Sequence, residues 1–377
     1  MTKMKIAYIN LLQTKVVGVN KKLEYLAKAI ETNNLDIDVI VINNEIDQVI
    51  NGVKYIKLPS KGFLDTFYRK FFRYKQFEKV VDFDKYDKII LRWSGLDLSV
   101  PNFVKKYGYK VISEHHANEL VQFKENIHSM STYVSYLLTK AMYSKFLKGV
   151  GGIIGVTPEI TKSHLLKKNV PHTTISNGVN VNDISFTKYI PFDGSELKIA
   201  FIASSYSKWH GLDRFLEGLK NYAGDVLITL SIAGNFSKKD QDEIKLYEKQ
   251  NIKIVFKGMC DEKQLDDILS NSNLAISTLA FFRVGIRYGC PLKSREYMAR
   301  GIPFIYSYHD DDIDGQDNFS LKYPDDESAI NIFEVIEFAK KVSENSMNIS
   351  QNMREFSLKN LDWNKKILQS SDFVKEV

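Results

Sequence analysis

A short stretch near residue 290 combines a proline, a lysine and a glutamate at spacings that suit anion binding. Pro291 fits the first position of a helix, where no backbone N–H is needed. The amides of Leu292 and Lys293 would then point outward from the positive end of the helix dipole, where the Lys293 ammonium adds a full charge. Glu296 follows three residues later on the same helix face. We expect Lys293 to hold phosphates and Glu296 to accept hydrogen bonds from ribose hydroxyls.

The same residues also have a purely structural interpretation. A glutamate in the first turn of a helix interacts favourably with the dipole, by ~0.3–1 kcal/mol. A lysine at such a place can simply be solvated. The stretch alone therefore leaves an anion site and an ordinary helix start as alternatives.

A second polar cluster follows a strand-like run in the first half of the chain, in the sequence Ser113-Glu-His-His-Ala-Asn-Glu119. Glu114, His115, His116 and Glu119 include metal-ligand types. Their spacing is not HExxH and no distant third ligand is evident, so we expect no metal. The remaining interpretation is structural, with one histidine at the end of the strand and the other exposed.

Two further segments have residue types that could bear on function. The acidic run His309-Asp-Asp-Asp-Ile-Asp-Gly315 has the spacing of a metal-dependent transferase, but we interpret it as a solvated loop. Residues 61–79 interleave Phe63, Phe67 and Phe71 with basic residues, namely Arg69, Lys70, Arg73, Lys75 and Lys79. A basic aromatic helix of this kind could lie in an anionic membrane interface. It could equally pack on the first sheet with a charged outer face.

The elements that must position these residues alternate between short β-branched runs and helix-length segments. Such alternation is typical of doubly wound parallel sheets with right-handed crossovers. The predicted strands are 5–10, 36–42, 53–56, 88–92, 110–113, 153–156, 173–175, 197–202, 226–233, 253–256, 274–277 and 303–306. The predicted helices are 20–31, 133–147, 211–222, 238–250, 262–269 and 292–300, with a helical tail over 329–377. The polar stretch 180–196 breaks the rhythm and is interpreted as a connection between two domains.

Length and composition are consistent with this organisation. The 377 residues suffice for two α/β domains, with 44% hydrophobic and 26% charged residues. The formal net charge of +6 is too mild to indicate nucleic acid by itself. We find no signal peptide and no run of the ~20 apolar residues that a membrane span needs. Two cysteines suit a reducing cytosol. We therefore predict a cytoplasmic protein, with 61–79 as a candidate contact with the inner face of the membrane.

Residues 291–303 resemble the donor-site motif of glycosyltransferase family 4, in the variant Pro-x-Lys-x-x-Glu-Tyr-x-Ala-x-Gly-x-Pro. Other segments resemble the family in the same order along the chain. They are Asn177-Gly-Val179 before the linker, Lys208-Trp-His-Gly-Leu-Asp213 in the first strand and helix of the donor domain, Ser231-Ile-Ala-Gly234, and Val255-Phe-Lys-Gly258 at the base-binding loop. The resemblance covers most of the second half of the chain and the first half more loosely.

The resemblance implies roles for individual residues. Lys293, Glu296 and the Leu292 amide would bind the nucleoside diphosphate, with Lys208 and His210 as the nearest candidates for a phosphate clamp and Gly258 at the base. His116, which we prefer over His115, would hydrogen-bond the donor sugar. Gly18 would be a close-approach glycine beside the diphosphate, with a turn glycine as the alternative.

The chain also departs from the family pattern. The family often has a glutamate where this chain has Tyr288, and that carboxylate often contacts the donor sugar. His210 stands where a lysine commonly precedes the glycine, and a neutral histidine is a weaker phosphate clamp. The family usually has two adjacent glycines where only Gly18 is present, followed by Val19.

The resemblance implies a GT-B fold, with two Rossmann-like domains facing a cleft and a C-terminal helix returning to the N-terminal domain. We place an acceptor domain at 1–185, a donor domain at 186–358 and the returning helix at 359–377. The implied function is a retaining, metal-independent hexosyltransferase of surface polysaccharide or glycoconjugate synthesis. It would use a UDP- or GDP-sugar, a glycan or lipid-linked glycan acceptor, and no cofactor. The alternatives are a non-catalytic GT-B subunit that binds glycan or a partner protein, and a GT-B sugar-nucleotide epimerase.

Overall fold

The fold is taken from a computed structural model of the 377-residue chain. It describes residues 4–11, 17–43, 49–58, 62–92, 95–166, 169–344 and 348–377, and only the backbone of residues 17 and 62–66. The chain forms two compact units, one of Met1–Ser176 with Trp363–Val377 and the other of Asn177–Asp362. We predicted boundaries at 185 and 358, so the second unit begins and ends at different residues from the predicted domain.

The first unit is built on a parallel sheet of seven strands in the order β3-β2-β1-β4-β5-β6-β7. The strands are β1 (Ile6–Leu11), β2 (Ile37–Asn43), β3 (Val53–Lys57), β4 (Lys88–Arg92), β5 (Val111–His115), β6 (Gly152–Gly155) and β7 (His172–Thr174). The central strands are buried on both faces, which explains their β-branched runs. The order reverses at β1, so ligands are expected at the carboxyl ends of the strands near this point.

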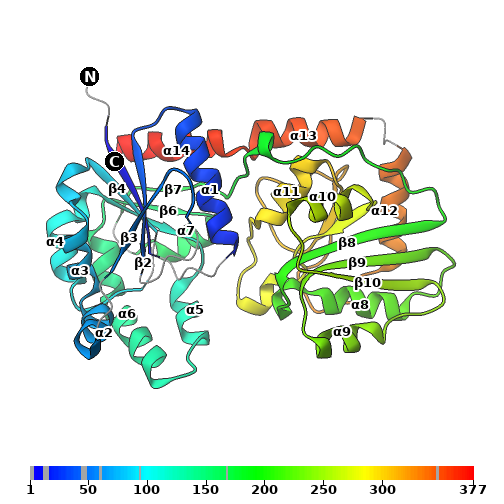
Figure 1. The fold of residues 1–377 in the computed structure, drawn as a ribbon, viewed down its shortest axis with the longest axis horizontal. Coiled ribbons are helices and arrows are strands. Elements are labelled where there is room, and N and C mark those ends of the chain that lie inside the picture. Colours follow the sequence, from blue (N-terminus) through cyan, green and yellow to red (C-terminus); the bar gives the residue numbers. More distant parts are fainter. Residues whose placement is uncertain are drawn as a thin grey trace. The chain divides into compact units, whose positions relative to one another are not determined.

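Eight helices are described in the first unit. They are α1 (Val17–Thr32), α2 (Gly62–Phe71), α3 (Arg73–Val80), α4 (Val100–Tyr107), α5 (Glu119–Glu125), α6 (Met130–Gly149), α7 (Pro158–His164) and α14 (Trp363–Glu376). Figure 1 shows the C-terminal α14, in red, beside the blue α1. Asn33 Nδ2 donates to Asn364 Oδ1 at 2.8 Å, and Lys366 Nζ donates to Ser176 Oγ at 2.7 Å. The last helix thus belongs to the first unit.

The second unit has a parallel sheet of six strands in the order β10-β9-β8-β11-β12-β13. The strands are β8 (Glu196–Ser205), β9 (Leu227–Asn235), β10 (Ile252–Gly258), β11 (Leu274–Ile276), β12 (Phe304–Tyr306) and β13 (Ser320–Lys322). The helices are α8 (Leu212–Asn221), α9 (Lys238–Lys245), α10 (Glu262–Ser270), α11 (Leu292–Arg300), α12 (Ile332–Glu344) and α13 (Ile349–Asn360). The edge strand β13 is absent from the predicted strands.

The stretch interpreted as a linker, 180–196, packs along the second unit. Its backbone donates to acceptors there: Thr187 N–H to Arg300 O at 2.9 Å and Tyr189 N–H to Ser350 Oγ at 2.8 Å. Tyr189 and Phe192 are buried in the core of that unit. The polar composition reflects a segment whose backbone needs partners from several helices, rather than a free connection.

Two further differences concern helices. The predicted helical tail divides into α12, α13 and α14, and the basic segment 61–79 contains two helices, α2 and α3. Within the described parts of the chain, no helix is both long and apolar enough to cross a membrane.

Candidate functional site

Helix α11 has the predicted bounds and lies in the second unit. It begins after Pro291, whose φ of −66° and ψ of 143° are extended, and it ends at Gly301, whose φ of +82° is left-handed. No side chain of Pro291 caps the first turn. Since the first amides of a helix have no acceptor within it, this end of α11 can bind an anion.

Lys293 is in the first turn of α11, and its buried ammonium has no hydrogen-bond partner within the described parts of the chain. Nζ lies 5.3 Å from the centroid of the Phe201 ring on β8. Burial lowers the pKa of Lys293 to about 7. A buried charge without a counterion is destabilised by several kcal/mol, so an anionic ligand would supply the missing partner.

His210 contributes a second buried nitrogen to this site. It ends the short 3₁₀ helix Lys208–His210, is buried, and has its ring centroid 3.8 Å from that of Trp209, with the two rings tilted by 35°. Among the residues that the structure describes, its Nδ1 has no hydrogen-bond partner. Burial, and then the charge of Lys293, lower the pKa of His210 to about 3. The imidazole is therefore neutral at pH 7 and can give an anion a single hydrogen bond.

Thr278 is a further polar group at this edge that the sequence analysis did not select. It lies two residues beyond β11, and no described residue is a hydrogen-bond partner of its buried Oγ1. The next amide, Leu279 N–H, donates to His210 O at 2.9 Å, which places this loop beside His210. The signal that could have revealed it is the Ser277-Thr278 pair directly after a buried strand.

The other residues predicted for the donor lie on different elements of the second unit. Glu296 is in the second turn of α11, with a largely buried side chain 3.9 Å from Arg300 Nη1, so it is not the first-turn glutamate of the structural interpretation. Lys208 has an exposed side chain. Gly258 ends β10 at a φ of +67°, and a Cβ there would meet no atom. Lys208, His210, Lys293 and Glu296 stay candidate ligands of a nucleotide.

The acidic run after β12 is not the solvated loop that we expected. Asp310 is buried and forms a two-bond ion pair with Arg295, whose side chain is fully buried on α11. Asp312 also contacts Arg295, at 2.9 Å. Asp314 accepts from Lys322 Nζ at 2.7 Å and from Tyr306 at 2.9 Å. The three carboxylates therefore bind side chains of the second unit, namely Arg295, Lys322 and Tyr306.

In the first unit, His116 lies at the carboxyl end of β5 within a polar cluster. Its Nε2 is 3.0 Å from Lys22 Nζ and 3.1 Å from Glu114 Oε2, and Glu114 also accepts from Tyr8 and Lys22. Burial, and then the charges of Arg92 and Lys22, lower the pKa of His116 to about 3. Nε2 faces both a donor, the Lys22 ammonium, and an acceptor, the Glu114 carboxylate, so these two contacts do not decide which ring nitrogen carries the hydrogen. In either tautomer the neutral imidazole has one hydrogen-bond donor and one acceptor.

His115 is fully buried and cannot serve in this way. Its Nε2 is 2.8 Å from Ser113 Oγ and its Nδ1 is 3.2 Å from Glu119 Oε2. The same carboxylate oxygen is 2.6 Å from His164 Nε2, on α7. His164 is the distant ligand type that the sequence analysis did not find, and one atom from each of the three groups lies within 4.8 Å of the others. The contacts are hydrogen-bond distances, so the three groups satisfy one another.

We expect Glu119→Gln to lower the free energy of unfolding by ~3 kcal/mol at pH 7, because it removes a buried charge from this network. Burial alone would raise the pKa of Glu119, but its contacts with His115 and His164 lower it below the usual value. The stabilisation is therefore present above the unfolded-state pKa of ~4.3 and is lost as the pH falls below it. Urea titrations at pH 7 and pH 3 measure this. The exposed Glu125→Gln on the same helix is the control, and an equal effect of both variants would contradict the network.

Gly18 lies in helix α1 and not in a turn. A Cβ built there would meet no atom within 4 Å. We expect Gly18→Ala to leave stability unchanged or raise it by up to ~1 kcal/mol, since alanine is the better helix former. If a diphosphate approaches this backbone, the same change should lower turnover at least tenfold. Thermal melts and turnover assays measure the two effects, and undiminished turnover would leave Gly18 as a helix residue only.

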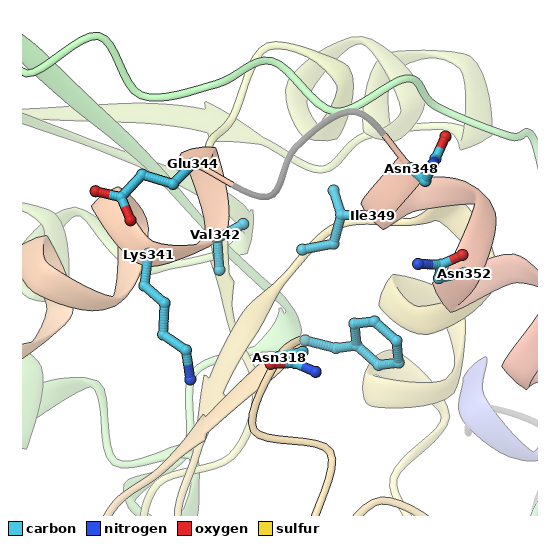
Figure 2. A pocket seen from close by; sticks show the side chains of 8 residues that line it. Asn318, Lys341, Val342, Glu344, Asn348, Ile349 and Asn352 are labelled. Atoms are coloured by element: carbon cyan, nitrogen blue, oxygen red, sulfur yellow. The ribbon is translucent and has the colours of Figure 1, made fainter.

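Two cavities, one in each unit, have volumes that would admit a ligand. The cavity of the second unit has about 480 Å³ and lies between the end of α12 and the start of α13, beside Phe319. Figure 2 shows Asn318, Lys341 and Asn352 around it. Phe319 directly precedes β13, so this cavity is at the amino ends of the strands, the edge opposite to the one that binds ligands in such sheets. The cavity of the first unit has about 740 Å³ and is at the carboxyl ends.

Tyr288 occupies the position where we noted a missing glutamate. Its ring stacks on His309 with centroids 5.1 Å apart, and the two residues are also joined by a parallel bridge. No carboxylate can act from this position.

Comparison with known proteins adds evidence on the fold. No protein-family model and no curated protein sequence matches the chain. Among solved structures, a glycosyltransferase from Rickettsia africae has 15% identity and a TM-score of 0.61, covering 100% of this chain and 99% of its own. Anabaena HepE in complex with UDP has 12% identity and a TM-score of 0.65, covering 99% and 100%. WaaG, a glycosyltransferase involved in lipopolysaccharide biosynthesis, has 11% identity and a TM-score of 0.61, covering 98% and 99%.

Identities this low show the fold alone. The similarity nevertheless extends over the whole chain in each case. It includes the two parallel sheets of seven and six strands and the helices that flank them. The chain therefore has the GT-B fold, as predicted from its sequence.

Proposed function

We propose that the protein is a glycosyltransferase that moves a sugar from a nucleoside diphosphate to a glycan acceptor. The observation that carries this proposal is the buried, unpartnered ammonium of Lys293 at the start of α11. An anionic ligand would stabilise the charged form of this ammonium. A diphosphate is the anion that we propose, because it also becomes the leaving group of the transfer.

In this proposal, Lys293 and the Leu292 end of α11 stabilise the charge that develops on the departing diphosphate. Such electrostatic stabilisation is commonly the largest catalytic contribution. His210 and Lys208 contact the phosphates, and Glu296 accepts from the ribose. Gly258 leaves room for the base, and His116 orients the sugar. Positive charge from Lys293 and the helix end takes the place of a metal ion.

The donor class is proposed from the solved relatives. HepE was solved with UDP and with UDP-glucose, and an α-glucosyltransferase of the same fold was solved with UDP-glucose. We therefore propose a UDP-sugar as the first donor to test and a GDP-sugar as the second. Retention of the anomeric configuration and a role in surface polysaccharide synthesis rest on the family resemblance.

A thermal-shift screen with UDP, GDP, ADP, CMP and their sugar conjugates tests the proposal. A ligand at a hundredfold excess over its dissociation constant stabilises by ~2.7 kcal/mol. We expect one nucleotide to raise the melting temperature of the wild type and to lose this effect in Glu296→Ala. The exposed Glu337→Ala, on α12 of the same unit, is the matched control and should keep the shift.

A non-catalytic subunit is the second candidate, and the stacked Tyr288 in place of a sugar-binding carboxylate favours it. Absence of any nucleotide shift would favour the subunit. A nucleotide shift with sugar release or transfer would exclude it.

A further inference from the structure

The turn that carries Lys208 and His210 has little regular structure of its own. Its 3₁₀ helix is closed by two backbone hydrogen bonds, from His210 N–H to Ser207 O at 3.0 Å and from Gly211 N–H to Lys208 O at 3.1 Å. A single turn of this kind has poorer hydrogen-bond geometry than an α-helix. We infer that contacts with the segment 279–284, which follows β11, set its position.

This segment packs directly against the turn. Leu279 N–H donates to His210 O at 2.9 Å. The rings of Trp209 and Phe281 are stacked, with 5.4 Å between their centroids and 9° between their planes. Gly211 has a left-handed φ of +71°, and a Cβ at this position would lie only 2.7 Å from Leu279 Cβ. The turn and the segment are therefore in contact through both backbone and side chains.

Arg283, in the last turn of the same segment, adds a charged group to this contact. Its Nη1 donates to Lys208 O at 2.8 Å. The guanidinium also forms two bonds with Asp213 at the start of α8, from Nη1 to Oδ1 at 2.9 Å and from Nη2 to Oδ2 at 2.8 Å. Its Nε donates to Glu327 Oε1 at 3.0 Å. One side chain, 17% exposed, thus joins the turn, α8 and the loop before α12.

The geometry of these bonds decides how much they matter. An isolated ion pair at a protein surface contributes little, but bidentate arginine pairs and networks of several charges are the exceptions. The planar guanidinium holds its donors in fixed directions, so it fixes the Lys208 carbonyl relative to the Asp213 carboxylate. A lysine ammonium at position 283 would be a point charge without this fork.

We propose that Arg283 is a positioning residue of the phosphate site, whose forked guanidinium fixes the turn that presents Lys208 and His210 to the diphosphate. Arg283 acts through this turn, because its own donors are taken by the Lys208 carbonyl and by two carboxylates. The identity of the ligand rests on the proposed function. The fixing of the turn rests on the contacts of Arg283 alone.

Hydrogen–deuterium exchange of the ligand-free protein tests the fixing of the turn. Arg283→Met removes the three polar contacts and keeps an unbranched side chain. We expect the amides of His210 and Gly211, followed in a peptide that spans the turn, to exchange about tenfold faster or more, while the amides of β8 keep their rate. A general loss of stability would accelerate both. Unchanged exchange in the turn, or equal acceleration in β8, would overturn the proposal.

Calorimetric titrations with UDP and with uridine test the consequence for binding, and GDP and guanosine take their place if GDP gives the thermal shift. Since Lys208 and His210 are proposed to contact phosphates, Arg283→Met should weaken UDP binding about tenfold or more and change uridine binding less than about twofold. Equal losses for the two ligands would contradict a positioning role at the phosphates. The control is Lys340→Met, which removes the cation of an exposed ion pair on α12 and should alter neither affinity.

Arg283→Lys keeps the charge but not the fork, and it should reproduce most of the loss in UDP affinity. It also replaces the methionine variant if melting temperatures show that the latter does not fold. Exchange and UDP affinity at wild-type values in Arg283→Lys would refute the role of the forked geometry. Absence of nucleotide binding by the wild type would refute the transferase, while the exchange of the turn would still decide whether Arg283 fixes it.

Discussion

Replacing Lys293 with methionine is expected to weaken nucleotide binding about tenfold to a hundredfold while raising the stability of the ligand-free protein. The variant removes a buried ammonium that has no hydrogen-bond partner among the described residues, and it keeps a side chain of similar length beside Phe201. A hydrogen bond to a charged group is worth ~1.5–3 kcal/mol, so nucleotide affinity should fall about tenfold to a hundredfold. Turnover should fall by ~10²–10³, the usual effect of losing one group that stabilises developing charge. The free energy of unfolding should rise by about 1 kcal/mol or more.

The pH dependence of the free energy of unfolding, compared between the wild type and Lys293→Met, tests whether the buried Lys293 charge causes the difference in stability. Burial lowers the pKa of Lys293 to about 7 in the ligand-free fold, whereas the unfolded chain keeps a value of ~10.4. Between these values the unfolded state binds one proton more, so the wild type gains stability as the pH rises. The advantage of the methionine variant should therefore be full below pH 7 and shrink above it.

Nucleotide binding should show the opposite trend. An anion binds the charged ammonium, so above pH 7 the wild type must take up a proton to bind. Its affinity should fall by up to tenfold per pH unit, and the variant should show no such slope. Urea titrations and calorimetry in two buffers of different ionisation enthalpy measure both effects. Lys220→Met, at an exposed site on α8, is the control, and a pH slope that persists in Lys293→Met would contradict the assignment.

The parts of this site that are specified by neighbouring residues could be predicted from the sequence. The bounds of α11 follow from Pro291 before its first turn and Gly301 after its last, because both act on the local backbone. The strands are buried β-branched runs whose pattern is local too. Lys293 and Glu296 could be selected because they lie on one short helix whose chemistry the sequence displays.

Pairs formed over long separations could not be predicted. His164 meets Glu119 across 45 positions, and only the placement of α7 beyond β6 brings them together. Helices α13 and α14 are separated at Leu361 and Asp362. The Leu361 carbonyl accepts a hydrogen bond from Val179 N–H, and the Asp362 carboxylate accepts one from Val181 N–H. The edge strand β13 has three residues, too few for a periodic pattern. In each case, contacts with residues that are distant in the sequence determine the local structure.

The acidic loop 309–315 is the clearest example of a structure set by a distant partner, because its Asp310 pairs with the buried Arg295. This pair is the basis of the second large effect on stability that we expect. Asp310→Ala should lower the free energy of unfolding by ~3–5 kcal/mol, because it leaves the fully buried Arg295 guanidinium without its main counterion. Asp311→Ala changes an exposed neighbour in the same loop and should stay within ~0.5 kcal/mol of the wild type. Urea titrations of both variants at pH 7 measure the difference, and similar values for the two would contradict the buried pair.

The double variant Arg295→Met/Asp310→Ala distinguishes this ion pair from a metal site. With both charges gone, no buried ion lacks a partner, so the double variant should regain most of the stability that Asp310→Ala loses. A metal-binding loop would behave differently, since removal of the arginine could not restore a lost metal ligand. Added Mg²⁺ or Mn²⁺ should accordingly leave the melting temperature of the wild type unchanged. Because Arg295 is between Lys293 and Glu296 on α11, Asp310→Ala should also weaken nucleotide binding, and the double variant should restore it as the helix regains its position.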